Sequence, residues 1–279
     1  MARSSGQSCP AMTYTNPGAY DRFMGRWSTR LAPSFIRFAG VRDGQRILDV
    51  GSGTGSLSRA LLAFSPRIAV VGVDPVVDYV SFAKEAVRDA RVEFRVGAAE
   101  ALPFPEETFD AALGLLILQD LTDASGAVRE MARVTRRSGT VATCKWDFRE
   151  GLPMLSLFWQ AAGSVAPEAV RQQQRRNSPP DASGLLELTQ LWAGAGLNHI
   201  RTARLELAMQ FESFDDYWLP FLGGATPTSA FASALNTETG GALAKALRDL
   251  IPDMRRDGSF VLPAVAWAVA GIAGSQASG

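Results

Sequence analysis

Residues 46–55, which read RILDVGSGTG, decide the fold class of this chain. Arg46–Val50 is an apolar run as short as a buried strand, and Ser56–Phe64 has the periodicity of a helix. Three glycines connect the two elements, at Gly51, Gly53 and Gly55. Glycine lets the backbone turn tightly and approach a ligand without interference from a Cβ. A glycine-rich turn between a strand and a helix is where open α/β sheets bind nucleotides.

The spacing of the glycines separates three classes of ligand-binding loop. A Walker loop requires lysine and then serine or threonine after its last glycine, but Gly55 is followed by Ser56-Leu57. A dinucleotide loop requires glycine or alanine at the sixth position, which Ser56 occupies here. The observed G-x-G-x-G, with Asp49 two residues before it, suits a ligand without pyrophosphate. S-adenosylmethionine (SAM) is such a ligand, because Asp49 can attract its ammonium and the N–H groups of the loop can reach its carboxylate.

A second acidic residue follows the next predicted strand. Ile68–Val73 is an apolar run that ends at Asp74-Pro75. An acid at the end of the second strand is placed to accept hydrogen bonds from the ribose hydroxyls of a nucleoside. The alternative is an ordinary glycine-rich turn whose two acids cap helices. The coincidence of all three features with strand ends favours the nucleoside site.

Apolar runs and helical segments alternate along the rest of the chain. Further strands are predicted at Val92–Val96, Phe109–Leu118, Thr140–Lys145, Ile200–Met209 and Phe260–Val269, and further helices at Val77–Ala90, Ala124–Thr135 and Leu185–Ala195. This alternation is typical of α/β proteins. We therefore predict an α/β fold with a doubly wound, seven-stranded, mostly parallel sheet of the Rossmann-like type and helical lid insertions.

The segments outside the sheet predict the domain organisation. We expect residues 1–13 to be a disordered tail and residues 14–279 to form a single domain. Within that domain, residues 14–40 are expected to form a cap helix, and residues 150–184 and 211–258 are expected to be lid insertions. Long insertions in compact domains tend to be functional. The aromatic residues of the second insertion, Trp218 among them, predict an apolar pocket that the cap helix helps to close.

Charge and composition exclude several classes of partner. The chain has 28 basic and 28 acidic side chains, whereas a nucleic-acid surface requires clustered lysine and arginine. With His199 as the single histidine and two cysteines, Cys9 and Cys144, neither a metal site nor a disulfide framework is expected. The N-terminus lacks the apolar segment of a signal peptide, and the apolar run Phe260–Gly274 is too short to span a membrane. We therefore expect a cytoplasmic protein without a membrane span, whose oligomeric state the sequence leaves open.

Four stretches of the chain together resemble a known family. They read ILDVGSGTG (47–55), VVGVDP (70–75), VEFRVGAAEALPFPEETFDAALG (92–114) and REMARVTRRSGT (129–140). In these stretches the chain resembles the class I SAM-dependent methyltransferases, in the group of the ubiquinone and menaquinone biosynthesis methyltransferases (methyltransferase type 11). The resemblance covers residues 45–146, and residues 19–40 resemble the segment that precedes the glycine loop in many bacterial members.

The resemblance implies which residues bind SAM. It assigns Asp74 to the ribose and the glycine-loop residues to the methionine end, namely Asp49, Gly51, Gly53 and Gly55. The segment from Gly97 to Phe104, with Ala99 and Glu100, corresponds to the adenine-binding loop, although Ala98 stands where the family usually has aspartate. A cap helix over the cofactor can also set Arg26 against the SAM carboxylate and an aromatic residue such as Tyr20 near the sulfonium. A surface role is the alternative for Arg26.

The chemistry that the resemblance implies places few demands on side chains. Methyl transfer from a sulfonium is an in-line displacement with a neutral leaving group, so an enzyme has to align the reactants and exclude water. A base is required only for an acceptor whose proton has a high pKa. His199, Asp120 and Asp147 are candidates with structural roles as alternatives, and no catalytic residue is assigned. Gln119 is either a solvated loop residue or part of the pocket wall.

The sequence therefore predicts a SAM-dependent methyltransferase that acts on a small, largely apolar metabolite. Two alternatives remain open on the sequence. A SAM-binding enzyme that transfers no methyl group, such as a cyclase or a decarboxylase, would carry the same binding motifs. An NAD-dependent oxidoreductase has a similar fold, but Ser56 in place of the third glycine argues against it.

Overall fold

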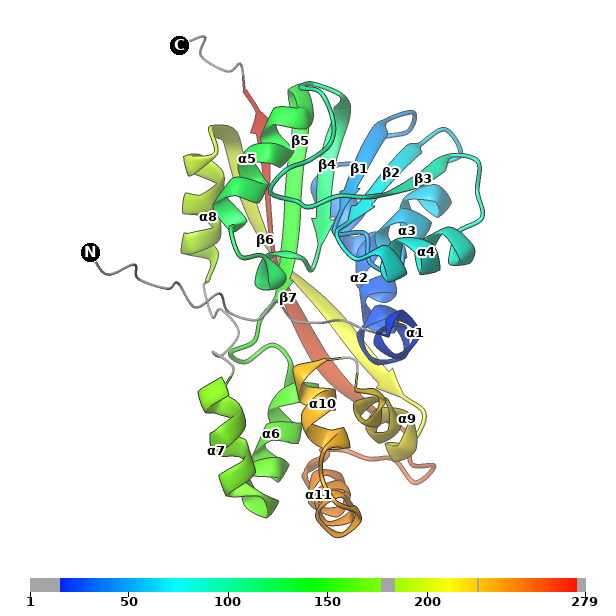
Figure 1. Cartoon of the computed structure of the whole chain (residues 1–279), viewed down its shortest axis with the longest axis vertical. Coiled ribbons are helices and arrows are strands. Elements are labelled where there is room, and N and C mark those ends of the chain that lie inside the picture. Colours follow the sequence, from blue (N-terminus) through cyan, green and yellow to red (C-terminus); the bar gives the residue numbers. More distant parts are fainter. Residues whose placement is uncertain (1–15, 177–183, 225, 275–279) are drawn as a thin grey trace, which may run out of the picture.

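A seven-stranded sheet in the order β3-β2-β1-β4-β5-β7-β6 forms the frame of the molecule (Figure 1). The computed structural model describes residues 16–176, 184–224 and 226–274, so the tail expected at residues 1–13 lies outside the described residues. The strands are β1 (Arg46–Val50), β2 (Ala69–Asp74), β3 (Val92–Val96), β4 (Phe109–Leu115), β5 (Thr135–Trp146), β6 (Leu197–Phe211) and β7 (Phe260–Ala273). Strand β7 is antiparallel to β5 and β6, and the other pairs are parallel. The predicted doubly wound, mostly parallel sheet is confirmed.

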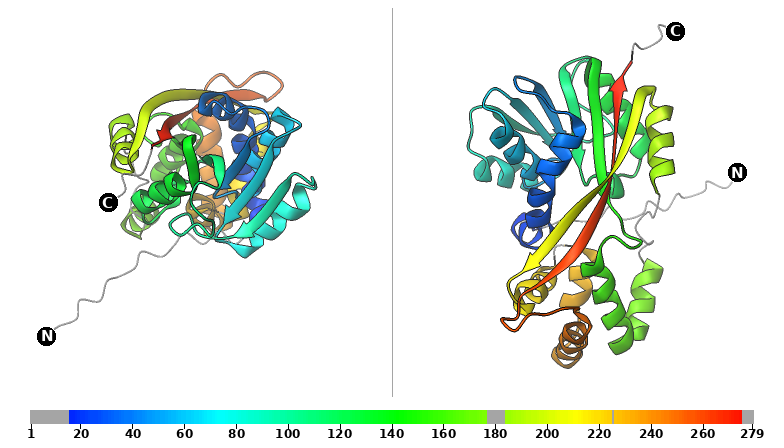
Figure 2. Two further views of the ribbon diagram at one scale, coloured as in Figure 1. Left: turned by 90° about the horizontal axis from the view of Figure 1, so that it is seen from above. Right: turned by 180° about the vertical axis from the view of Figure 1, so that it is seen from behind.

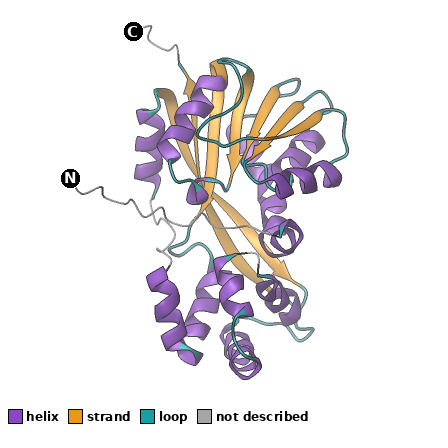
Figure 3. Cartoon of the chain, viewed as in Figure 1, coloured by secondary structure: helices purple, strands orange, loops and turns teal. Residues whose placement is uncertain are grey.

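Helices cover both faces of the sheet (Figure 3). One face carries α2 (Arg26–Ala39), α3 (Ser56–Phe64) and α4 (Val77–Ala86), and the other carries α5 (Ala124–Val134) and α8 (Leu185–Gly194). Consecutive residues of β1 show how the two layers are built, because Ile47 packs with the first set of helices and Leu48 with the second. A strand that is buried on both faces needs apolar residues at successive positions, as at Ile47, Leu48 and Val50, and the buried acid Asp49 is the exception.

Two strand boundaries differ from the prediction for local reasons. Strand β4 ends at Leu115 instead of Leu118, because Leu116 adopts a positive φ of 62° and its N–H donates to Cys144 O. Residues Leu118–Asp120 then form a 3₁₀ turn, η2. Strand β5 begins at Thr135 instead of Thr140, because the chain passes Ser138, with φ 62°, as an irregularity within the ladder. The strand thus continues through a bulge and is longer than predicted.

Strands β6 and β7 extend beyond the sheet as a twisted ribbon that carries a group of helices (Figures 1 and 2). This helical module consists of α6 (Pro153–Val165), α7 (Pro167–Arg176), α9 (Phe214–Trp218), η3 (Leu219–Gly223), α10 (Pro227–Ser233) and α11 (Thr237–Leu250). It lies beyond the carboxyl ends of the parallel strands, because β5 leads into α6 and β6 leads into α9. These helices fall in the ranges expected for the lid insertions, and their action as a lid stays a prediction.

The N-terminal segment lies between the sheet and the helical module. It starts with α1 (Pro17–Tyr20), whose N-cap Asn16 accepts a hydrogen bond from Ala19 N–H at 2.9 Å. A π-helical turn, η1 (Asp21–Gly25), follows and leads into α2, which ends at Gly40 with a left-handed φ of 73°. The described helices include none that is long and apolar enough to cross a membrane.

Candidate functional site

The loop between β1 and α3 requires glycine at its turning points. Gly51, Gly53 and Gly55 all have positive φ, at 65°, 50° and 83°. A Cβ on Gly51 would lie 2.4 Å from Ile117 Cγ2, and a Cβ on Gly55 would lie 2.9 Å from Val87 Cγ2. The loop therefore cannot keep its path with larger residues at these two positions.

Asp74 ties this glycine loop to the end of β2. Its carboxylate accepts hydrogen bonds from Gly53 N–H at 3.0 Å and from Val76 N–H at 2.9 Å. The side chain is 8% exposed, and burial raises its pKa. Each carboxylate oxygen can accept a second hydrogen bond, so the bridge leaves Asp74 able to accept from a ligand hydroxyl.

Asp49 is the most deeply buried acid of the loop. Its side chain is 1% exposed and accepts a hydrogen bond from Ser58 Oγ, on α3, at 2.6 Å. Burial raises the pKa of Asp49 to about 7. An acid in this state is neutral in slightly acidic solution and ionises readily when a cation approaches.

The segment expected to hold adenine is fixed by two residues of α5 that the sequence analysis did not assign. Glu130 accepts from Leu102 N–H at 2.8 Å, and Arg133 donates to the carbonyl oxygens of Phe104 at 2.9 Å and of Leu102 at 3.1 Å. The two side chains also form an ion pair with Arg133 Nε 2.7 Å from Glu130 Oε1. In the sequence, the signal for this ion pair was an acid and an arginine three residues apart on a predicted helix. In the same segment Ala99 is buried and Glu100 is half-buried.

Tyr20 is brought to the edge of the glycine loop by the N-terminal segment. Its ring packs edge-on against Tyr79, with 5.8 Å between the ring centroids. Burial raises the pKa of Tyr20, and the carboxylates of Asp120, Asp74 and Asp21 raise it further. These acids therefore converge with Tyr20 on one place, at the carboxyl ends of β1, β2 and β4.

Arg26 has a different partner from the one that the sequence suggested. It donates to Asp216 Oδ1 at 2.6 Å and to the backbone oxygen of Asp216 at 3.0 Å. Its guanidinium also lies over the Trp27 ring, 4.4 Å from the centroid. The structure thus directs Arg26 to α9 in the helical module, whereas the expectation placed it against a SAM carboxylate.

The remaining polar candidates separate into residues near the loop and residues away from it. Ile117 touches the position of Gly51, so the adjacent η2 lies against the loop. Gln119 Oε1, on η2, and Ser52 Oγ, in the loop, are buried without hydrogen-bond partners in the described part of the chain. His199, by contrast, is exposed near the start of β6, at the amino end of that strand.

Two further polar residues, Lys145 and Asp147, lie at the end of β5 and just after it. Asp147 accepts from Arg149 N–H at 3.1 Å and so closes a turn after β5, which is the structural alternative considered for it. Lys145, one of the last residues of β5, is 2% exposed, and the sequence analysis did not single it out. A charged residue at the end of the predicted strand Thr140–Lys145 was the available signal.

The aromatic residues of the helical module mostly pack on one another. Phe158 stacks on Phe221 with 4.6 Å between centroids, and Tyr217 donates from its hydroxyl to Met154 O at 2.7 Å. Phe211, Phe214 and Phe221 are buried in the same cluster, while Leu219 is exposed. Most of the aromatic residues expected to line a pocket therefore form the core of the module.

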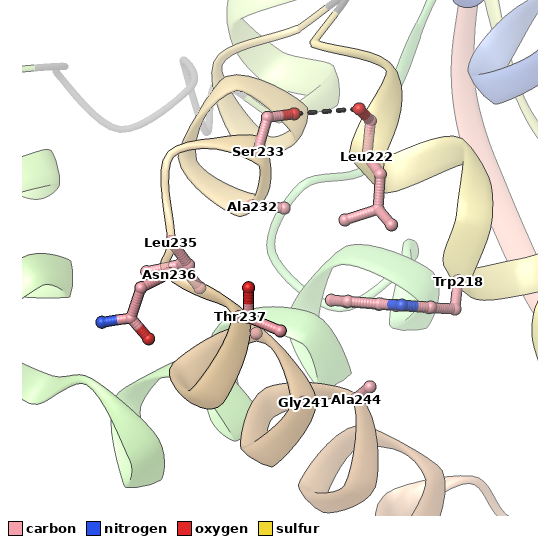
Figure 4. A pocket seen from close by; sticks show the side chains of 10 residues that line it. Trp218, Leu222, Ala232, Ser233, Leu235, Asn236, Thr237, Gly241 and Ala244 are labelled. Atoms are coloured by element: carbon pink, nitrogen blue, oxygen red, sulfur yellow. Dashed lines mark hydrogen bonds between the residues drawn. The ribbon is translucent and has the colours of Figure 1, made fainter.

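Trp218 combines packing with a cavity wall. It stacks on Phe214 and also faces a cavity of about 420 Å³ between η3, α10 and α11 (Figure 4). The cavity is lined mainly by apolar and small residues, namely Trp218, Leu222, Ala232, Ser233, Leu235, Asn236, Thr237, Gly240, Gly241 and Ala244. A volume of this size is within the range of small-molecule sites.

Comparisons with known proteins agree with the geometry of the loop. The family model described as "Methyltransferase domain" matches residues 48–143. A demethylmenaquinone methyltransferase of Roseiflexus sp. (strain RS-1) is 35% identical over 170 residues, which cover 56% of this chain and 68% of the relative. A ubiquinone/menaquinone biosynthesis C-methyltransferase of Geotalea uraniireducens (strain Rf4) is 32% identical over 134 residues, which cover 46% of this chain and 54% of the relative.

Solved structures show the same fold. The YcgJ protein from Bacillus subtilis matches with a TM-score of 0.57 at 22% identity, over 88% of this chain and 99% of that protein. A phosphoethanolamine N-methyltransferase of Haemonchus contortus, solved with SAM, matches with a TM-score of 0.59 at 19% identity, over 94% of this chain and 58% of that protein. Together with the sequence relatives, these matches show that the chain belongs to the class I SAM-dependent methyltransferases of the ubiquinone/menaquinone biosynthesis group and has SAM as its cofactor.

Proposed function

We propose that this methyltransferase transfers a methyl group to a small, largely apolar metabolite by in-line displacement, at the carboxyl ends of β1, β2 and β4. The observation that carries the proposal is the glycine loop, with three left-handed glycines and the Asp74 carboxylate tied to Gly53 N–H. This loop lies at the carboxyl edge of the sheet, and the helical module lies beyond the same edge. A cavity of this module, with Trp218 in its wall, is the place that we propose for the acceptor.

The residues around the loop fit SAM at each of its parts. The buried carboxyl of Asp49, with its raised pKa, suits the ammonium of the methionine end, and the N–H groups of the glycine loop suit its carboxylate. Asp74 suits the ribose, and the segment with Ala99 and Glu100, which α5 fixes, suits the adenine. Tyr20 lies near enough to Asp74 to border the same site, whereas Arg26 would have to leave Asp216 to join it.

The protein's own contribution to the reaction is alignment and exclusion of water. SAM supplies an activated methyl group on its sulfonium, so the nucleophile of the acceptor has to be held in line with it. The N-terminal segment, with Tyr20 and α2, lies against the loop and the helix that follows it, and the helical module lies beyond the carboxyl edge of the sheet, where a lid would exclude water. Apolar walls favour this reaction because the positive charge of the sulfonium disperses as the methyl group is transferred.

The cofactor assignment is tested by Asp74→Ala. Loss of charge-assisted hydrogen bonds to the ribose should weaken SAM binding by about 1–3 kcal/mol in isothermal titration calorimetry. Asp78→Ala is the matched control, because Asp78 is exposed in the first turn of α4 and should leave the affinity unchanged. Equal affinities for SAM in the folded Asp74→Ala variant and in the wild type would reject Asp74 as a ribose ligand.

The acceptor class is tested with methyl-labelled SAM and a fractionated cell extract. Label should appear in a small molecule that partitions into organic solvent, and Trp218→Ala should reduce this transfer at least fivefold at saturating SAM. Trp159→Ala is the matched control, because Trp159 belongs to the same module but does not line the cavity. Label found only in protein or nucleic acid would overturn the proposal of an apolar metabolite. Full transfer by folded Trp218→Ala would remove Trp218 from the acceptor site.

A further inference from the structure

The segment from Asp21 to Arg26 contacts two parts of the molecule that are far apart in sequence. At its start, Asp21 Oδ1 accepts from Thr54 Oγ1 at 2.9 Å. Thr54 is the residue between the second and third glycines of the glycine loop and is 2% exposed. At its end, Arg26 makes the two hydrogen bonds to Asp216 on α9. One short segment thus joins the proposed SAM loop to the helical module.

The backbone of this segment is built to bring Asp21 to the loop. Residues Asp21–Gly25 form a π-helical turn, in which Arg26 N–H donates to Asp21 O. Such turns are rare and occur frequently at functional sites. A Cβ on Gly25 would lie 2.4 Å from Asp21 Oδ1. The glycine therefore leaves room for the carboxylate to fold back along the helix and reach Thr54.

Further contacts fix the same segment on the start of α3. Ser56 Oγ donates to Gly25 O at 3.4 Å, and Thr29 Oγ1 donates to Ser56 Oγ at 3.1 Å. Arg59 Nη2 lies 3.9 Å from Asp21 Oδ1. Because all of these partners belong to the glycine loop or to the helix that follows it, a displacement of the loop would be passed to this segment.

At the other end, Asp216 holds the start of α9. It accepts from Arg26 and, with its second oxygen, from Glu212 N–H at 3.1 Å. Its own N–H donates to the N-cap Ser213 at 3.1 Å. Helix α9 continues to Trp218, which lines the cavity. A shift of Arg26 would therefore shift α9 and, with it, the part of the cavity wall that Trp218 forms.

We propose that Asp21 is a positioning residue that couples SAM binding to the acceptor cavity. With SAM in the glycine loop, the Thr54–Asp21 hydrogen bond holds the π-helical turn, and the Arg26–Asp216 pair holds α9 in turn. The cavity wall is then more firmly ordered when the cofactor is bound, so the cofactor prepares the site of the acceptor. This inference rests on the proposed placement of SAM in the glycine loop.

Hydrogen exchange of the full chain, with and without saturating SAM, tests this coupling. In the wild type, SAM should slow exchange in the glycine loop and also, by about tenfold, at the amides of residues 214–219. Asp21→Ala removes the acceptor of the Thr54 hydrogen bond, and Gly25→Ala forces the Asp21 carboxylate from its place, so each should keep the slowing in the loop and reduce that in residues 214–219 to less than twofold. Asp216→Ala, which removes the side-chain acceptor of Arg26, should give the same result. Gly18→Ala is the matched control, because a Cβ there meets no atom closer than 3.7 Å.

Two results would overturn the proposal. If SAM slows exchange in residues 214–219 of Asp21→Ala and Gly25→Ala as much as in the wild type, the coupling bypasses Asp21. A wild type in which SAM slows the loop alone would show that no coupling exists. The failure of the proposed cofactor placement looks different, because SAM would then bind in calorimetry without slowing any amide of residues 51–55, and this inference would fall with it.

Discussion

Replacing Asp49 by asparagine should stabilise the ligand-free protein and at the same time weaken its binding of SAM. The carboxyl is 1% exposed, its hydrogen bond comes from the neutral hydroxyl of Ser58, and burial raises its pKa from 3.8 to about 7. An ionised carboxylate at this position is unfavourable until a cation arrives. Asparagine keeps the size of the side chain and an oxygen that can accept from Ser58, but it carries no charge.

The direction of the pKa shift gives the sign of the stability effect. The unfolded chain releases this proton near pH 3.8, whereas the folded protein keeps it up to about pH 7, so the stability of the wild type falls as the pH rises through this window. A pKa difference of one corresponds to about 1.4 kcal/mol, which sets an upper limit of about 4 kcal/mol on the penalty at pH 8. The variant lacks this penalty. Its melting temperature at pH 8 should exceed that of the wild type by about 2–4 °C for each kcal/mol gained, and the difference should shrink toward pH 4.

SAM binding should depend on pH in the opposite direction. If Asp49 binds the ammonium, only its ionised form contributes, and the affinity of the wild type should rise by up to about twentyfold between pH 5.5 and 7.5. An α-amino group has a pKa near 8, so the ligand stays mainly protonated in this window. Asp49→Asn should bind more weakly and with a smaller pH dependence. Calorimetry of binding and thermal unfolding at constant ionic strength measure both effects. A flat affinity of the wild type across the window, or a variant that is less stable than the wild type at pH 8, would refute the reasoning.

Three other substitutions probe the loop, its support and the module. Gly51→Ala should reduce SAM affinity at least tenfold because of the 2.4 Å approach to Ile117, whereas Gly44→Ala, with positive φ but open space, should cost about 1 kcal/mol of stability and leave calorimetric affinity unchanged. Glu130→Gln should lower SAM affinity about threefold to tenfold with little change in melting temperature, since it loosens the adenine segment without opening the core. Tyr217→Phe should destabilise the protein by about 1 kcal/mol in denaturant titration, because it removes the buried hydrogen bond from the Tyr217 hydroxyl to Met154 O. An unchanged midpoint would contradict this value.

Several elements could be predicted closely from their patterns, since β1 is buried on both faces and the edge strand β3 alternates apolar and polar residues. The observed bounds of β1 and β3 equal those predicted, and α3 also begins and ends as expected. At β4 the error falls where an apolar run continues past the end of the hydrogen-bond ladder, whereas β5, β6 and β7 are longer than predicted. Leu116 is as apolar as the strand before it, yet it turns with a positive φ that its residue type does not announce. An apolar sequence pattern indicates which residues are buried, but it does not show where the strand ends, because the residues after β4 are buried too.

The site could be predicted only where its contacts are local. Asp74 and Gly53 lie at two successive strand ends, so their meeting follows from the parallel order of β1 and β2. The partner of Arg26 is 190 residues away, and no local pattern points to Asp216. Glu130 presents a third case, because its helix could be predicted but its contact with Leu102 depends on how α5 is placed against the adenine segment.

The distribution of aromatic residues indicates how cofactor binding and acceptor choice are separated in this chain. The family model matches residues 48–143, which end before the helical module begins at α6. The stacked rings of the module, such as Phe158 on Phe221, are continuous with the core on one face of the sheet, since Phe221 also packs edge-on against Phe23 of the N-terminal segment. The rings thus fix where the module stands relative to the cofactor loop. The cavity is bounded in addition by Gly240, Gly241 and Ala244 of α11. If this cavity holds the acceptor, as we propose, substitutions at these small residues change its shape while the glycine loop stays intact, and the acceptor can change without a change in cofactor binding.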